Sequence, residues 1–280
     1  CEMAVRALDA LLDYQSYPVL AAEIANKARR PLGIGIINFA YWLAKNDLKY
    51  QDIDESGLRK IDKMAEAWSY YLIKASVKLA KEKGACEWSD QTKYAQGILP
   101  IDTYKKDVDD LTNFMKPSVD ASREVWKSLR EDLKKYGIRN STLMALMPAE
   151  TSAQISNSTN GIEPPRALVS IKQSKDGVLA QVVPEIRRLK NKYDLLWDQK
   201  SPLGYLKIMA VLQKYVDQSI SVNTSYNPKF YPEEQIPMSE LLQHLLLCYK
   251  WGIKTLYYFN TADGAGEVDV ELKPVEADEA

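Results

Sequence analysis

Apolar residues recur every three or four positions over several long stretches of the chain, which is the period of a helix with one buried face. The clearest case is 55–83, where apolar positions run from Leu58 to Leu79 and lysines precede Gly84. A basic last turn followed by glycine is typical of a helix end. Further helices are expected at 2–14, 118–136, 185–199, 203–219 and 238–249.

The segment 118–136 is expected to be amphipathic, with Val125, Leu129 and Leu133 on its buried side and Gly137 at its end. Before it, 102–117 carries mixed charge and is expected to form a helical segment on the surface.

Short apolar runs between these helices predict strands. One run, 143–147, stops at Pro148, and another, 253–259, is rich in residues that favour strands and is expected to be buried. Two further runs flank Lys175-Asp176-Gly177, which is typical of a hairpin turn. The proline-punctuated stretch 223–237 is expected to be a loop.

The residues after Pro148 predict a turn that enters a helix. Thr151 or Ser152 is placed to cap this helix, and Gln154 stands three residues after Thr151 as in a capping box. Free backbone N–H groups and the positive end of a helix dipole attract anions, phosphates included. On spacing alone, an ordinary strand-to-helix turn and a phosphate site both stay open.

Gly33 and Gly35 have the first spacing of a dinucleotide-binding motif, but its third glycine is missing and no clear strand precedes them. Close packing of a helix against neighbouring backbone is the favoured interpretation, because glycine has no Cβ in the way.

Composition excludes several classes of protein. The 280 residues are 46% hydrophobic and 27% charged with a net charge of −1, so no overall field points to nucleic acid or to an acidic membrane. No stretch has the roughly 18 uninterrupted apolar residues of a membrane span. Three dispersed cysteines without a CxxC motif favour a reducing, cytoplasmic compartment.

Few residues are candidates for metal or thiol chemistry. Cys86 follows a helix beside acidic residues and is interpreted as structural. His244 is the only histidine and stands four residues before Cys248, but a metal site or catalytic pair there lacks a third partner. No metal site is therefore predicted.

The composition changes after Thr261. Residues 262–280 hold seven acidic residues against Lys273 alone and no aromatic residue, which predicts a flexible acidic tail. The chain also begins with Cys1 inside an expected helix, so we expect it to be a piece of a longer protein.

Taken together, the turn after Pro148 and the Thr255-Leu256-Tyr257-Tyr258 element resemble the C-terminal part of the large (alpha) subunit of aerobic class I ribonucleoside-diphosphate reductases, of the bacterial or phage type. The resemblance covers nearly the whole chain. It is carried by ALDALLDYQ (7–15), RPLGIGIINFAYWLAK (30–45), GILPIDTYKKD (97–107), RNSTLMALMPAETSAQISNSTNGIEPP (139–165), DQSISVNT (217–224) and KTLYYFNT (254–261).

The resemblance implies the C-terminal half of a ten-stranded α/β barrel over 1–261, followed by the tail at 262–280. It implies that Ala149, Glu150, Thr151 and Ser152 surround the substrate diphosphate. Glu150 is expected to contribute its N–H, because its carboxylate would be repelled by phosphate. Many members of the family have serine where this chain has Ala149, so one hydroxyl contact is missing.

Tyr257 and Tyr258 match the adjacent tyrosines that, in this family, pass a radical from the small subunit to a catalytic cysteine. Neighbours on a regular strand face opposite sides, so a stacked pair requires an irregular backbone here. Packing of two ordinary strand tyrosines is the alternative.

Several parts of the family are absent from this sequence. It has no NxCxE motif for the radical-forming cysteine, no active-site redox cysteines, no allosteric region and no C-terminal cysteine pair. The resemblance therefore implies that the chain needs an N-terminal portion of the large subunit. It further implies a small (beta) subunit with a metal-generated tyrosyl radical, and thioredoxin or glutaredoxin as reductant.

The expected reaction is reduction of ribonucleoside diphosphates, with no cofactor bound by this chain. The chain is expected to be either a trimmed polypeptide or the C-terminal piece of a subunit encoded in two parts. The competing hypothesis is a non-catalytic α/β interaction module that kept the fold.

Overall fold

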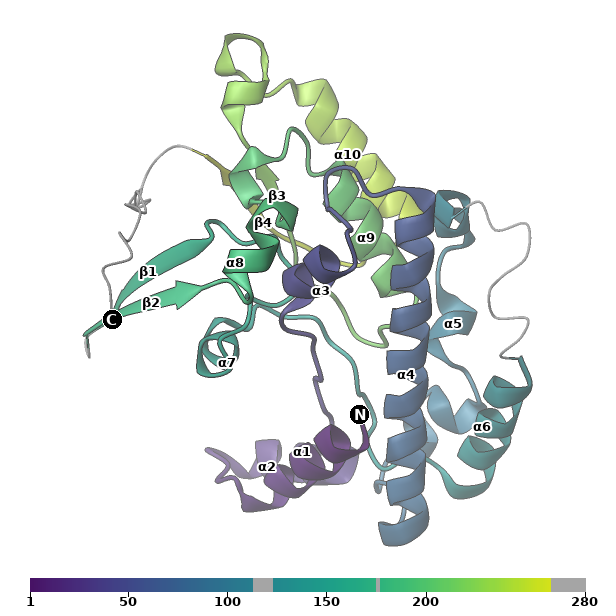
Figure 1. Cartoon of the computed structure of the whole chain (residues 1–280). Coiled ribbons are helices and arrows are strands. Elements are labelled where there is room, and N and C mark those ends of the chain that lie inside the picture. Colours follow the sequence, from purple (N-terminus) through teal and green to yellow (C-terminus); the bar gives the residue numbers. More distant parts are fainter. Residues whose placement is uncertain (113–122, 175–176, 263–280) are drawn as a thin grey trace.

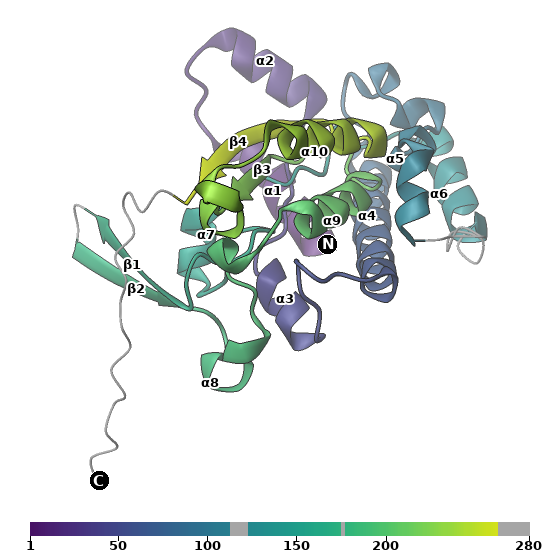
Figure 2. The ribbon, with the colours of Figure 1, turned by 90° about the horizontal axis from the view of Figure 1, so that it is seen from above.

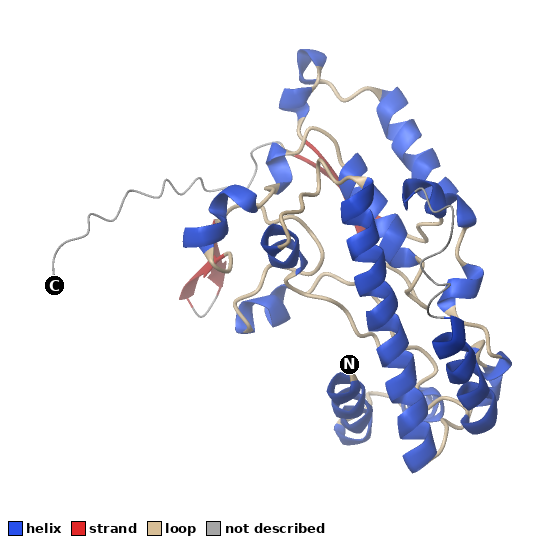
Figure 3. Ribbon diagram, turned by 45° about the vertical axis from the view of Figure 1, so that its right-hand side comes forward, coloured by secondary structure: helices blue, strands red, loops and turns tan. Residues whose placement is uncertain are grey.

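The computed structural model describes residues 1–112, 123–174 and 177–262. Helices make up most of the regular structure, and the strands are short (Figures 1 and 3). The α-helices are α1 (Glu2–Tyr14), α2 (Leu20–Arg29), α3 (Phe39–Lys45), α4 (Glu55–Lys83), α5 (Pro100–Thr103), α6 (Arg123–Tyr136), α7 (Glu150–Ile155), α8 (Ile186–Leu189), α9 (Leu203–Gln213) and α10 (Met238–Trp251). The strands are β1 (Val169–Ser174), β2 (Gly177–Val182), β3 (Val222–Tyr226) and β4 (Leu256–Thr261).

The long helix α4 forms as its pattern predicts and organises one side of the molecule. At its start, the Asp54 carboxylate accepts the Gly57 N–H at 2.7 Å, and at its end Gly84 has a φ of 87°. Its buried face, which includes Ile61 and Leu72, packs against α1, α9 and α6 (Figures 1 and 2). Helix α9 is buried on all sides, as expected for an element at the centre of the core.

Four extended segments lie side by side in parallel and in chain order. Segment 32–36 meets segment 142–147 through the Ile34–Met144 bridge, and the latter meets the residues just before β3 through the Leu146–Ile220 bridge. Strand β3 then pairs in parallel with β4. Parallel neighbours need crossover connections, and the intervening helices supply them. The predicted α/β class with many helices is confirmed, and within the described residues this array stays open at both edges instead of closing into a barrel.

The Asp217 side chain binds the beginning of segment 142–147 through hydrogen bonds. Its carboxylate accepts the N–H groups of Leu143 and Met144, both at 2.8 Å, and the hydroxyl of Tyr94, also at 2.8 Å. Burial raises the pKa of this carboxyl although the three donors act in the opposite direction. The segment that these bonds hold leads directly into Pro148 and α7.

Of the two glycines in the 33–35 stretch, Gly35 packs closely, as expected, but against an extended segment and not within a helix. A Cβ on Gly35 would come within 3.1 Å of the Ala145 carbonyl oxygen. The β1–β2 hairpin is also confirmed, with Ser174 paired to Gly177. Its turn at 175–176 lies outside the described residues, as does 263–280, where most of the acidic tail was predicted.

The helix predicted at 118–136 is described from Arg123 onward, as α6. One of the three residues predicted to be buried in it is exposed. Val125 is exposed, and Trp126 takes its place beside Leu129 and Leu133. Residues 126, 129 and 133 have the i, i+3, i+7 spacing of a single stripe, and the Trp126 indole N–H donates to Glu66 at 3.0 Å. Of the helical segment predicted at 102–117, the described part forms only short pieces, α5 and a 3₁₀ helix at Lys106–Thr112.

Four further expectations are wrong. The helix predicted at 185–199 breaks into α8 and two single 3₁₀ turns, because only Leu189 and Tyr193 among its apolar residues are buried. The helix at 203–219 ends at Gln213, and the predicted loop at 223–237 begins with most of β3. Strand β4 forms where predicted but is not buried, since Leu256 to Phe259 are all exposed at the edge of the array.

Candidate functional site

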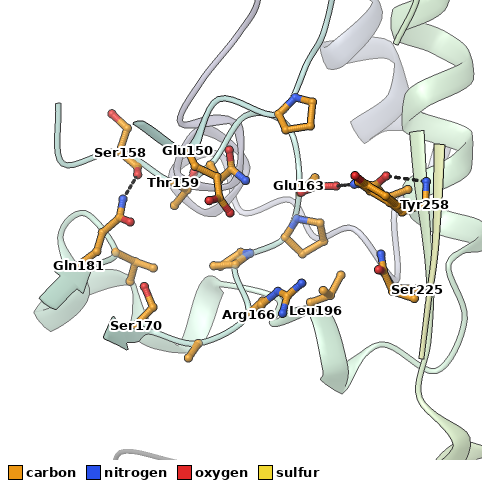
Figure 4. A pocket seen from close by; sticks show the side chains of 18 of the residues that line it. Glu150, Ser158, Thr159, Glu163, Arg166, Ser170, Gln181, Leu196, Ser225 and Tyr258 are labelled. Carbon is orange, nitrogen blue, oxygen red and sulfur yellow. Dashed lines mark hydrogen bonds between the residues drawn. The ribbon is translucent and has the colours of Figure 1, made fainter. Parts of the chain in front are cut away.

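A pocket of about 250 Å³ opens beside the carboxyl ends of the parallel segments (Figure 4). Its walls come from four parts of the chain: the stretch that follows segment 142–147, the hairpin, the turn at Leu196 and the β3–β4 pair. The polar and charged lining residues are Glu150, Ser158, Thr159, Asn160, Glu163, Arg166, Ser170, Gln181, Asn223, Ser225, Tyr258 and Asn260. In open α/β folds this end of the strands is where ligands bind.

The turn predicted to bind phosphate borders this pocket, with a different cap from the one expected. Ala149 is the N-cap of α7 and makes no side-chain cap bond, so the predicted cap at Thr151 or Ser152 is wrong. Both residues lie inside the first turn of α7, where a side chain cannot act as N-cap. The Ala149 N–H donates instead to the Asn160 side-chain oxygen at 3.0 Å, which holds the turn against the pocket loop.

The four predicted phosphate residues differ in exposure and position. Ala149 is half-buried, and Glu150, Thr151 and Ser152 are exposed; of the four, Glu150 alone lines the pocket. The N–H groups of the first helical turn have no intrahelical acceptor, so this turn offers backbone donors.

The loop that lines the pocket is tied to the body at both sides. Asn38 and Thr159 exchange bonds: the Asn38 N–H donates to the Thr159 carbonyl at 2.9 Å, and the Thr159 N–H donates to the Asn38 side chain at 3.1 Å. On the other side, the Gln181 amide donates to the Ser158 carbonyl at 2.6 Å and joins the hairpin to the loop. The Gln181–Ser158 bond lies at the left side of the pocket in Figure 4.

Tyr257 and Tyr258 contact each other at the exposed edge of β4. Their ring centroids are 4.3 Å apart at an interplanar angle of 56°. Tyr258 is one of the residues that line the pocket. A side-chain hydrogen bond and charge interaction with Tyr257 raise the pKa of Tyr258 above its ordinary value.

The pairing of β3 with β4 is irregular at these tyrosines. Val222 pairs with Leu256 and Thr224 with Phe259, so β4 holds one residue more than β3 over the same interval. This is a β-bulge, and it changes the alternation of side chains along the strand. Two consecutive tyrosines can therefore meet.

Asn223 and Glu163 were not among the residues that the sequence singled out. Asn223 accepts the Tyr258 N–H on its side-chain oxygen at 3.0 Å, and its NH₂ group donates to the Glu163 carboxylate. Burial raises the pKa of Glu163. Asn223 was missed because it fell in a predicted loop. Glu163 carried a weak signal, as a single charge between Gly161 and two prolines.

A family model for the ribonucleotide reductase barrel domain matches residues 1–259. The chain belongs to the ribonucleotide reductase family. It is 57% identical to the ribonucleoside-diphosphate reductase subunit alpha of Haemophilus influenzae over 96% of its length. It is 54% identical to the reductase 1 subunit alpha of Escherichia coli over 94% of its length, and 48% identical to the subunit alpha of Enterobacteria phage T4 over 99%.

These matches confirm the resemblance to a bacterial or phage alpha subunit. The reductase chain spans about a third of the length of these relatives: 34% for the two bacterial proteins and 36% for the phage protein.

The cysteines and the histidine of this reductase chain lie away from the pocket. Cys1 is exposed, while Cys86 and Cys248 are buried, and burial raises the pKa of the Cys248 thiol to about 11. His244 is buried against the Tyr226 hydroxyl, which lies 2.9 Å from its Nδ1. These contacts agree with the structural interpretation of Cys86 and of the His244–Cys248 pair.

Metal-binding groups and membrane-spanning helices are both absent from the described part of the reductase chain. It holds no group of three or more histidine, cysteine, aspartate or glutamate residues arranged for a metal ion. Within the same residues, no helix is both long enough and apolar enough to span a bilayer.

Proposed function

We propose that this chain is part of the large (alpha) subunit of a class I ribonucleoside-diphosphate reductase, in which it supplies the substrate diphosphate loop and the tyrosine radical relay. The observation that carries the proposal is that one pocket is lined both by Glu150, in the first turn of α7, and by Tyr258 of the contacting tyrosine pair. In this proposal the four parallel segments belong to one half of a ten-stranded barrel.

The diphosphate would lie at the start of α7, against the backbone of Ala149, Glu150, Thr151 and Ser152. First-turn N–H groups and the helix dipole favour an anion there. The Glu150 carboxylate opposes a diphosphate, so its contribution is the N–H. Arg166 carries the single positive charge among the described lining residues and offsets part of this repulsion.

Tyr257 and Tyr258 would relay the radical. A tyrosine can lose an electron and a proton together, and its ordinary pKa near ~10 keeps it neutral beforehand. Ring contact at 4.3 Å gives a short path between the two side chains. The remainder of the large subunit would supply the catalytic cysteine, and the small (beta) subunit would supply the radical.

A dithiol supplies the two electrons that the overall reaction consumes. The 2′-hydroxyl of the ribonucleoside diphosphate leaves as water, a hydrogen replaces it, and the dithiol, regenerated by thioredoxin or glutaredoxin, is oxidised to a disulfide. This chain would contribute binding and radical transfer. A cytoplasmic location stays a prediction.

The test is formation of deoxycytidine diphosphate by this chain mixed with the remaining portion of the large subunit, the small subunit and a dithiol. The same mixture is run with Tyr258→Phe, which keeps the ring and removes the hydroxyl. Tyr71→Phe is a matched control, because Tyr71 is similarly exposed (55%, against 57% for Tyr258) and lies on α4.

Product from wild type and from Tyr71→Phe, with none from Tyr258→Phe, is the expected result. Equal product from all three mixtures would refute the relay. If no mixture forms product, the competing hypothesis of a non-catalytic interaction module gains support.

A further inference from the structure

We propose that Asn223 is a positioning residue for the tyrosine pair: its side-chain amide holds the bulge of β4 and links that bulge to Glu163. The inference rests on the proposed relay and adds a residue to it.

The first argument is the hydrogen bonding of the bulge. In a regular ladder, backbone groups of one strand bond backbone groups of the next. The extra residue of β4 falls between the Val222–Leu256 and Thr224–Phe259 pairs, directly opposite Asn223. There the Tyr258 N–H donates to the Asn223 side chain at 3.0 Å. A side-chain acceptor thus replaces a backbone acceptor where the register shifts.

The second argument is the direction of the tyrosine side chains. Without the extra residue, consecutive side chains would point to opposite faces of the sheet. The bulge changes this alternation and allows ring centroids 4.3 Å apart. A bond that stabilises the bulge therefore stabilises the ring contact.

The third argument is that Asn223 is held in one orientation. Its oxygen meets a donor, the Tyr258 N–H, and its NH₂ group meets an acceptor, the Glu163 carboxylate. A flipped amide would place oxygen against carboxylate and NH₂ against N–H, so both bonds would be lost. The position needs a donor and an acceptor on one short side chain, and the asparagine amide provides both on separate atoms.

Glu163 reaches Asn223 from the loop that lines the pocket, about 60 residues earlier in the chain. The amide therefore couples the pocket loop to the strand that carries the tyrosines (Figure 4). A substrate contact that moves the loop would therefore change the position of the Asn223 side chain and, through it, the geometry of the bulge.

The first arm of the test measures hydrogen exchange of the Tyr258 amide in the 280-residue chain. Asn223→Ala removes the acceptor and should speed exchange about fivefold or more, the effect of one lost hydrogen bond. Asn223→Asp combined with Glu163→Gln keeps an acceptor for the Tyr258 N–H and gives it an amide donor in place of the Glu163 carboxylate, so this double variant should restore most of the protection. Asn227→Ala is the matched control: this asparagine lies just beyond β3 and donates to the Trp197 carbonyl at 2.6 Å, away from the bulge.

Unchanged exchange in Asn223→Ala, or an equal increase in Asn227→Ala, would overturn the proposal. Should Asn223→Ala not fold, the double variant Asn223→Asp/Glu163→Gln decides, since exchange as fast as in an unprotected strand amide would refute the bond.

The second arm measures kinetics in the reconstituted reductase mixture. Asn223→Ala should lower kcat at least tenfold and leave KM for cytidine diphosphate within about twofold, because relay geometry and not ground-state binding is affected. A raised KM with unchanged kcat would overturn the positioning role, as would normal kinetics despite faster exchange. If even wild type forms no product, the proposed function fails, whereas the exchange arm still decides whether Asn223 holds the bulge.

Discussion

The rings of Tyr257 and Tyr258 lie 4.3 Å apart although the two residues are consecutive on one strand. The contact exists because β4 carries one extra residue opposite Asn223. The two phenols therefore interact, and Tyr257 raises the pKa of Tyr258. The following predictions test this pair and the surroundings that hold it.

Tyr257→Phe should lower the pKa of Tyr258 towards its ordinary value, because the variant removes the hydrogen-bonding hydroxyl that raises it. The measurement is a fluorine NMR titration of a fluorotyrosine placed at position 258. Tyr71→Phe should leave the titration unchanged. A Tyr258 pKa that stays the same in Tyr257→Phe would contradict a phenol–phenol hydrogen bond.

Asp217→Asn should destabilise the chain by about 1–3 kcal/mol. The new NH₂ group would face an N–H donor whose hydrogen bond the carboxylate now accepts, so that bond would be lost. Denaturant unfolding measures the change. Asp132→Asn is the control, since Asp132 forms a half-exposed ion pair with Lys81 and should cost less than about 1 kcal/mol. Equal effects would show that Asp217 does not hold segment 142–147.

The stability of the chain should fall as the pH drops below about 6.5, through the lowered pKa of His244. Burial lowers this pKa, while Glu240 at 4.0 Å acts in the opposite direction; Tyr226 and Ser201 also contact the ring. Below the ordinary pKa the unfolded chain binds a proton that the folded chain does not, so unfolding is favoured. Above about 6.5 this contribution is constant.

The check is the free energy of unfolding from pH 5 to 8, for wild type and for His244→Gln. Because His244 is the only histidine, the variant should lose the part of the slope that lies just below pH 6.5. An unchanged slope would assign the pH dependence to carboxyl groups.

Gly204→Ala should destabilise the chain by more than about 3 kcal/mol or prevent folding, because its Cβ would lie 1.9 Å from the Tyr50 carbonyl oxygen. A backbone atom cannot move aside as a side chain can. Gly33→Ala is the matched control: its Cβ would meet the Met147 side chain at an ordinary 3.5 Å, so its effect should stay within about 0.5 kcal/mol. Similar melting temperatures for the two variants would contradict this packing.

The sequence by itself determined the elements that depend on local periodicity and end signals. Helix α4 runs from the residue after Asp54 to the residue before Gly84, as its apolar spacing and basic last turn predict. The hairpin at 169–182 and the helix that begins at Met238 were likewise predictable, and so was the family, because its motifs are contiguous stretches.

Only the tertiary structure decided how the site is assembled. Strand β3 has mostly polar residues and lacks a strong local pattern, so its partner in space makes it a strand. Ala149 caps α7 because Asn160 accepts its N–H, which no spacing rule indicates. The β4 bulge, the Asn223 amide and the burial of Glu163 depend on contacts between residues 35 to 60 positions apart. Such long-range hydrogen bonds leave no periodic trace in the chain, because each is set by the packing of other elements.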